Sequence, residues 1–137
     1  MQQARRIRQD AAKFLGLLGF TVSDKDALLG FSLRSVTEFI RNATNQPEVP
    51  AGLHMAAVYR TAGEYLRAML DSGQVTDEQM AAADEESAAV KQIKEGDTTV
   101  TYAVQDALTA AQRFDRLVQA LLAAGAGQFA AHRRIRW

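Results

Sequence analysis

The sequence contains no cysteine, which excludes disulfide bonds, thiolate nucleophiles and thiolate metal sites. Proline occurs only at Pro47 and Pro50, so long helices are permitted on either side of that pair. Aromatic residues make up only 7% of the 137 residues, and alanine and leucine dominate the apolar set. A chain of this length and composition fits one mainly helical domain rather than a β-sandwich.

Neither sign of charge is in excess, because 16 basic residues balance 16 acidic ones. The molecule as a whole therefore gives no argument for binding nucleic acid or a membrane. The distribution is uneven, however: arginines cluster near both ends of the chain, and the stretch 69–89 contains acids but no base. Two interpretations stay open, namely head-to-tail pairing between copies and simple solvation of exposed helix faces.

Long hydrophobic runs are missing too. The apolar segment 14–20 is short, and no small-residue cleavage site follows it, so it does not have the form of a signal peptide. The uncharged stretch 117–131 is too short to span a bilayer. We therefore expect no membrane partner.

Apolar residues recur at helical spacing and predict helices over residues 3–18, 24–44, 50–72, 77–89 and 104–124. Ser23 is the expected N-cap of the second helix, and Thr76 with Gln79 has the form of a capping box before the fourth. The link between the second and third helices is short, which predicts that these two pack as an antiparallel pair.

Residues 90–103 break the helical pattern, because β-branched residues alternate beside Glu95, Gly96 and Asp97. This pattern predicts a β-hairpin or one extended arm, which needs support because an isolated hairpin is marginal in water. The predicted fold is mainly α: a small bundle of about four to five helices. The arm is inserted before the last long helix, and residues 125–137 form an extended C-terminal tail.

The order of features from Phe14 to the C-terminus resembles the head–tail connector (adaptor or neck) proteins of long-tailed bacteriophages and prophages. The segments that carry the resemblance are 19–29, 39–45, 49–53, 62–66, 90–102 and 132–137. The most specific of them are the run Lys94, Glu95, Gly96, Asp97 before the β-prone stretch and the arginine-rich end at Trp137.

The resemblance implies a structural virion protein that binds the portal as a ring of about twelve copies, a heterologous closed symmetry. Such a ring extends the DNA channel and docks the next neck or tail protein, a stopper or tail-completion protein. It lies in the virion neck, is assembled in the host bacterial cytoplasm and has only non-specific proximity to packaged DNA. Its function is stoichiometric binding without enzymatic turnover.

Ring assembly needs complementary patches on each subunit, and two segments are candidates. The arm would join copies by adding an edge to a neighbour, or else would form a local hairpin on its own bundle. Its candidate residues are Ile93, Lys94, Glu95, Gly96, Asp97, Val100 and Tyr102.

The tail is the second candidate segment. It would bind the portal, being disordered in the free chain and ordered in the complex, or else it is a frayed terminus. Its candidate residues are Phe129, His132, Arg133, Arg134, Ile135, Arg136 and Trp137.

Arg5, Arg6 and Arg8 either face DNA in the channel or are a solvated helix face. We expect no enzyme activity, cofactor or metal site: His54 and His132 have no expected serine or aspartate neighbours, and Glu48 is the nearest candidate co-ligand of His54. Two alternatives to the connector function are a generic helical protein-binding adaptor or regulator and a nucleic-acid-binding regulator that uses the basic ends.

Overall fold

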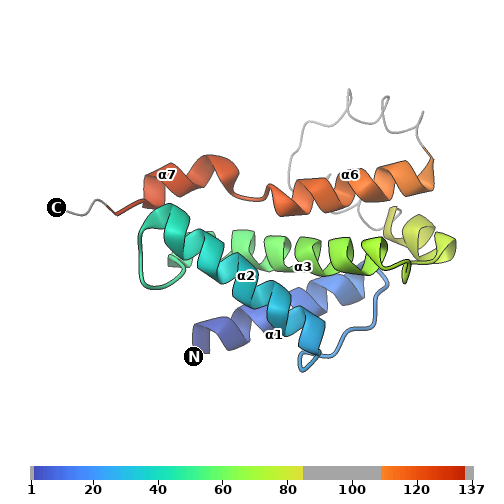
Figure 1. Cartoon of the computed structure of the whole chain (residues 1–137), viewed down its shortest axis with the longest axis horizontal. Helices are drawn as coiled ribbons and strands as arrows, with labels where there is room; N and C mark the ends of the chain where they lie inside the picture. Colours follow the sequence, from blue (N-terminus) through green and yellow to red (C-terminus); the bar gives the residue numbers. More distant parts are fainter. Residues whose placement is uncertain (1, 85–108, 135–137) are drawn as a thin grey trace.

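In the computed structural model, which describes residues 2–84 and 109–134, the chain is a helical bundle (Figure 1). The mainly α prediction is therefore confirmed at the level of fold class, and no strand occurs within these two described ranges. The predicted arm 90–103 lies outside the described residues. So do the end of the predicted fourth helix, 85–89, and residues 104–108.

The first two helices begin and end where local signals place them. Helix α1 (Gln2–Leu17) lies within one residue of its prediction and ends before Gly19, which has φ +96°. Helix α2 (Ala27–Thr44) begins later than predicted, because Asp26 and not Ser23 is its N-cap. The Asp26 carboxylate accepts the Leu29 amide at 3.1 Å, whereas the Ser23 hydroxyl accepts the Lys25 amide in the preceding turn.

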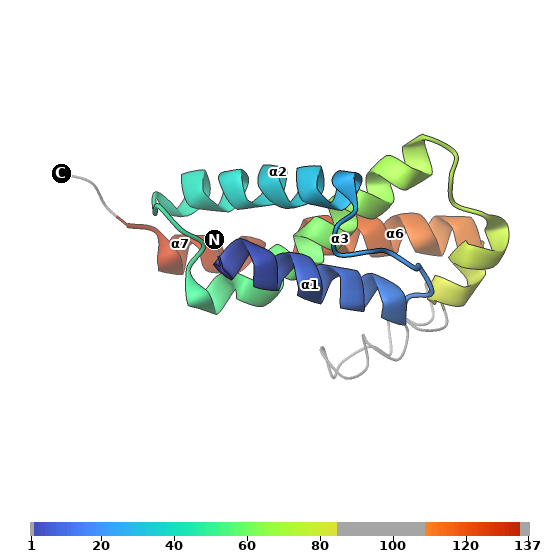
Figure 2. The same cartoon turned by 90° about the horizontal axis from the view of Figure 1, so that it is seen from below.

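Helix α3 (His54–Asp71) is the centre of the bundle and contacts α1, α2 and α6. The 3-10 turn η1 (Ala51–Leu53), which follows Pro50, leads into it. Helices α2 and α3 run in opposite directions, as the short link between them predicted (Figures 1 and 2).

A helix that begins at residue 77 follows α3, and the predicted capping box at its start is present. The Thr76 hydroxyl accepts the Gln79 amide at 3.1 Å, and the Gln79 side chain accepts the Thr76 amide at 2.9 Å. Buried Met80 and Ala83 join this helix to the core. The described part of the helix is residues 77–84.

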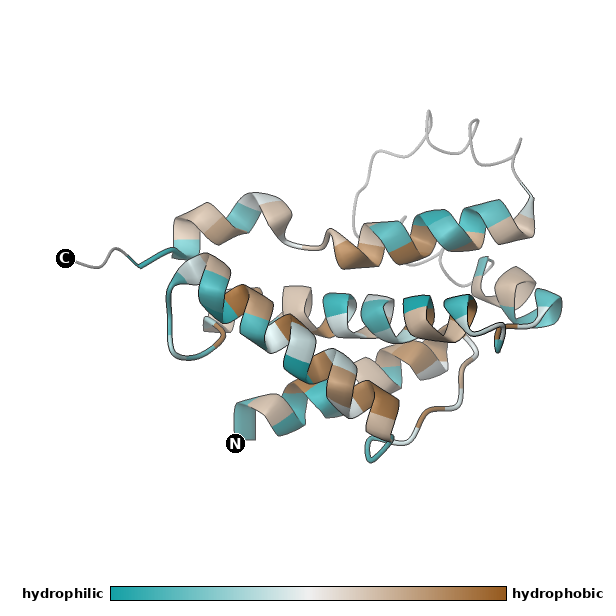
Figure 3. Ribbon diagram, viewed as in Figure 1, coloured by the Kyte–Doolittle hydropathy of each residue, from teal (hydrophilic) through white to brown (hydrophobic). Residues whose placement is uncertain are grey.

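Helix α6 (Ala110–Leu122) begins later than the predicted start at residue 104. Thr109 is extended, with ψ 162°, and forms a second capping box with Gln112. Hydrophobic periodicity alone did not distinguish this capping residue from a residue inside the helix. Most of the visible surface of α6 is hydrophilic, while its buried stripe faces α3 (Figure 3).

The core is one continuous cluster between these helices. Its largest fully buried side chains are Phe114, Ile7, Leu15, Leu18, Leu29, Ile40, Leu53, Leu66, Val58, Val118, Thr44 and Thr61. The hydroxyls of Thr44 and Thr61 each donate to the carbonyl four residues earlier at 2.7 Å, so their burial leaves no polar atom unsatisfied. Ala4 and Ala111, which fit the apolar spacing of α1 and α6, are nevertheless exposed in the first turns of these helices.

The C-terminal segment differs most from the prediction of an extended tail. Gly125, at φ +74°, ends the α6 region, and η2 (Ala126–Gln128) and α7 (Phe129–His132) follow. Helix α7 continues beyond α6 and lies against α2, so residues 126–132 are helical and docked (Figure 1). Gly125 and Gly127 interrupt the helical spacing of apolar residues in the sequence. The chain nevertheless stays helical and packed after Gly125.

Candidate functional site

The described part of the C-terminal tail is attached to the end of α2 by backbone hydrogen bonds. The Arg134 amide donates to the Thr44 carbonyl at 2.7 Å, and the Asn45 side-chain amide donates to the Arg134 carbonyl at 3.0 Å. The Gln46 side-chain amide donates to the His132 carbonyl. Because Asn45 is in the left-handed conformation as the C-cap of α2, its side chain is free to reach the tail.

An aromatic and guanidinium cluster fixes α7 beside α2 and α3. The rings of Phe39 and Phe129 meet edge to face with centroids 5.8 Å apart. The Arg60 guanidinium lies 5.2 Å from the Phe39 centroid and 4.7 Å from the Phe129 centroid. Its Nε also donates to the Ala124 carbonyl at 2.6 Å. Burial lowers the pKa of Arg60, and the charge of nearby Glu64 opposes that shift.

Two glycines allow the tail to approach the bundle closely. A Cβ on Gly125 would lie 2.6 Å from the Ala56 Cβ, and one on Gly52 would lie 2.6 Å from the His132 ring. Gly52 precedes α3, so the tail crosses the bundle where α3 begins. The sequence had marked Gly125 as a helix break, but only the structure shows its contact with Ala56.

The tail residues proposed as portal contacts therefore divide into three groups. Phe129 and His132 are half-buried against the bundle, whereas Arg133 and Arg134 are exposed. The remaining tail candidates, Ile135, Arg136 and Trp137, lie outside the described residues. The expectation of a disordered free tail differs from the structure over residues 126–134, which are docked on the chain's own helices.

The N-terminal arginines also divide. Arg5 and Arg6 are exposed on the first turns of α1. Arg8 instead donates to the Asp26 carbonyl at 2.9 Å and lies against Gly30, so it joins α1 to the start of α2. Its remaining Nε is buried without a partner among the described residues. The periodicity could not distinguish these roles, because all three arginines lie mostly off the apolar stripe.

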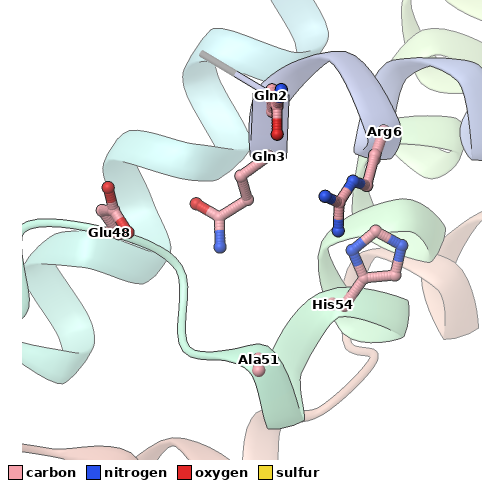
Figure 4. A pocket seen from close by; sticks show the side chains of 6 residues that line it. All are labelled: Gln2, Gln3, Arg6, Glu48, Ala51 and His54. Carbon is pink, nitrogen blue, oxygen red and sulfur yellow. The ribbon is translucent and has the colours of Figure 1, made fainter.

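A polar cavity of about 490 Å³ opens between the start of α1 and the start of α3 (Figure 4). Its lining residues are Gln2, Gln3, Arg6, Glu48, Ala51 and His54. The His54 ring lies behind this cavity within 2.8 Å of an Asp10 carboxylate oxygen. The expectation that His54 has no aspartate neighbour is therefore wrong, because Asp10 lies on a different helix.

Polar and charged side chains line this end of the bundle. The His54 and Asp10 pair is a half-exposed bridge between α1 and α3. Within residues 2–84 and 109–134, no three His, Cys, Asp or Glu side chains are placed to bind a metal ion together. None of the described helices has both the length and the hydropathy that crossing a bilayer requires.

The chain matches no protein-family model, no curated protein and no solved structure. The candidate site is thus defined by its own geometry: a docked tail, a polar cavity and exposed arginines. We call this end of the molecule the basic end and define it by Arg5, Arg6, Arg133 and Arg134.

Proposed function

We propose that the chain is a head–tail connector, a structural protein that binds a phage or prophage portal and continues the DNA channel below it. The proposal rests on the ordered sequence features given above, and one structural observation supports it. The exposed Arg133 and Arg134 lie at the end of the docked segment 126–134. Arginines beside a fixed aromatic anchor are the composition typical of protein-binding hot spots.

The docked segment gives such a contact a defined direction. Phe129 and the bonds to Thr44 and Asn45 fix residues 129–134, so the residues that follow begin from a fixed point. A tail tethered in this way loses less conformational entropy on binding than one that is free from Gly125 onward. In this proposal the side of the basic end that carries Arg133 and Arg134 faces the portal. Its Arg5 and Arg6 side is left for contacts between copies, and the downstream neck protein uses another surface.

The direct test mixes purified portal rings with three forms of the chain. These are the full chain, a version truncated after Phe129, and the double variant Arg133→Gln/Arg134→Gln. Arg116→Gln is the matched control, because Arg116 is exposed on α6. We expect the full chain and the control to bind, and the truncated and double-variant chains to bind at least about tenfold more weakly, or about 1.4 kcal/mol.

The outcomes separate the parts of the proposal. Equal binding by the full and truncated chains removes the tail from the portal contact. Failure of the full chain to bind portal rejects the connector function and leaves the generic helical adaptor. Circular dichroism of each variant checks that the bundle is folded.

A further inference from the structure

Charged side chains in the body of the bundle pair with one another. Arg67 on α3 lies 3.1 Å from Asp115 on α6, and Arg113 lies 2.8 Å from Asp84. These ion pairs join neighbouring helices. The charges in the body of the bundle therefore have partners within the same molecule.

The charges at the two ends of the bundle do not pair in this way. Arg5, Arg6, Arg133 and Arg134 form no ion pair with the residues that the structure describes, and all are exposed. They lie at the same end of the bundle: Arg6 lines the cavity with His54, and a Cβ on the nearby Gly52 would meet the ring of His132, which precedes Arg133. Glu48 matches the charge of Arg6 in this cavity, so the excess positive charge of the basic end comes from Arg5, Arg133 and Arg134.

The opposite end is acidic. Asp71 is the last residue of α3, and Asp77 and Glu78 begin the next helix. All three are exposed, and none forms an ion pair with a described residue. The nearby Arg67 and Arg113 are already engaged with Asp115 and Asp84. We call this surface, defined by Asp71, Asp77 and Glu78, the acidic end.

Helix stability does not explain the whole of this arrangement. Asp77 and Glu78 suit the positive start of their own helix. Asp71, however, is at the negative C-terminus of α3, and Arg5 and Arg6 are near the positive N-terminus of α1. These positions oppose the helix dipoles, which points to a role for the charges outside the folded monomer.

The two ends cannot neutralise each other within one molecule. Helix α3 has 18 residues and separates them by about 27 Å at 1.5 Å per residue. That separation is about three Debye lengths at physiological ionic strength. The two views place the beginning of α3 and α7 at one end and residues 77–84 at the other (Figures 1 and 2).

We propose that the acidic end of one copy binds the basic end of the next, in a heterologous head-to-tail contact between copies of this chain. The basic end has the cavity, and the acidic end has the segment 71–78, which is exposed except for Val75 and includes the helix start at residue 77. Each surface also has an exposed apolar side chain nearby. Met55 is 49% exposed in the first turn of α3, and Leu17 is 64% exposed near Gly19, which approaches Ala82.

A contact between two different surfaces repeats, and it closes into a ring when the rotation between copies permits. This inference rests on the proposed function for the ring and deepens it by naming the joining surfaces. The contact itself involves only this chain and can be tested without portal.

The first experiment uses the absence of cysteine from the sequence. Gln2→Cys and Ser72→Cys place single thiols at the basic and acidic ends without changing any charge. Under oxidation in low salt, their mixture is expected to form at least about fivefold more disulfide-linked dimer than either variant alone. Ser35→Cys, on an exposed part of α2, is the matched control partner and is expected to give only the background amount.

The second experiment blocks one end at a time. Variant Arg5→Gln/Arg6→Gln keeps an intact acidic end, and variant Asp71→Asn/Glu78→Gln keeps an intact basic end. In sedimentation velocity, the unchanged chain is expected to self-associate in a concentration-dependent way at low salt, and at least about tenfold more weakly in high salt. Each variant alone is expected to be monomeric, and an equimolar mixture is expected to form a one-to-one dimer.

Several results overturn the proposal. The first is that the unchanged chain stays monomeric at millimolar concentration in low salt. The second is that the single-end variants associate as strongly as the unchanged chain. The third is that the basic end binds duplex DNA but no second copy of the chain. If portal binds while these tests fail, the connector function stands without this contact. If the dimer forms but portal does not bind, the contact stands and the connector function fails. Thermal melting confirms that both variants fold.

Discussion

The centre of the bundle and the docked tail are held by different kinds of contact. Helix α3 is covered on several sides, and side chains such as Leu66, Val58 and Ala62 are fully or almost fully removed from water. The tail is held by one half-buried aromatic side chain, Phe129, and by hydrogen bonds at its edge. Burial of apolar area therefore stabilises the first region far more than the second.

This difference means that the two regions can fail separately. Loss of a core contact unfolds the whole cooperative bundle, whereas loss of a tail contact releases only a terminal segment. A protein that rebuilds its C-terminal contacts during assembly can do so without unfolding.

Phe114→Ala is expected to lower the free energy of unfolding by about 3 to 5 kcal/mol, because it leaves a cavity beside Phe20. The ring centroids of Phe20 and Phe114 lie 6.0 Å apart, and Phe114 is fully buried. Urea denaturation measures the change. Phe31→Ala is the matched control, since Phe31 is 69% exposed and its loss is expected to change stability by less than about 0.5 kcal/mol. Equal losses would show that the core is not organised as described.

Gly63→Ala is expected to destabilise the chain by about 1 to 3 kcal/mol, although alanine is the better helix former. Its Cβ would lie 2.9 Å from the Leu121 Cβ and 3.1 Å from the Leu122 backbone nitrogen, so α3 and α6 would have to separate. Gly16→Ala is the control, because its Cβ meets nothing within 4 Å in α1. It is expected to stabilise the chain by up to about 1 kcal/mol in the same denaturation series. A stabilised Gly63→Ala variant would contradict the close approach of the two helices.

Phe129→Ala is expected to release the tail while changing the free energy of unfolding of the bundle by less than about 1 kcal/mol. The Arg134 amide, which donates to Thr44, should then exchange with solvent at least about tenfold faster in hydrogen-exchange NMR. Gln128→Ala, at an exposed neighbouring position, is the control and should leave that exchange rate unchanged. If the amides throughout α3 also lost their protection from hydrogen exchange, the tail and the core would be unfolding together.

Tyr65→Phe is expected to have the smallest effect, visible only at alkaline pH. Burial, and secondarily the charge of Asp26, raise the pKa of Tyr65 above its usual value of 10.0. The unfolded chain therefore loses this proton first, so the contribution of Tyr65 to stability is present below about pH 10 and is lost as pH rises above it. Thermal melts from pH 8 to 11 should fall less steeply for the phenylalanine variant. If the melting temperatures of the two chains fell equally with pH, the neutral phenol of Tyr65 would not be stabilised by burial.

Local signals in the sequence predicted much of the helical framework. The apolar stripes of α1, α2, α3 and α6 are largely the buried residues, and the Thr76 capping box is present. The errors occurred where two signals competed. Asp26 replaced Ser23 as the N-cap of α2, and Thr109 began α6 inside a stretch with continuous helical periodicity.

The candidate site was harder to predict, because its residues come from distant parts of the chain. Arg60 and Phe39 appeared to be ordinary helix residues, and only the fold places both against Phe129. His54 and Asp10 are 44 residues apart in sequence, which no local pattern relates. The proposed arm residues lie outside the described part of the chain and stay a prediction.

The sequence by itself determined the helical class and most of the buried residues, because periodicity and capping act within a few neighbouring residues. It also determined that arginines gather near its termini and acids in its middle. Only the packed structure shows that the tail docks against α2 after Gly125 and that the charges lie at opposite ends of α3. These features depend on side chains that meet only after the helices have packed.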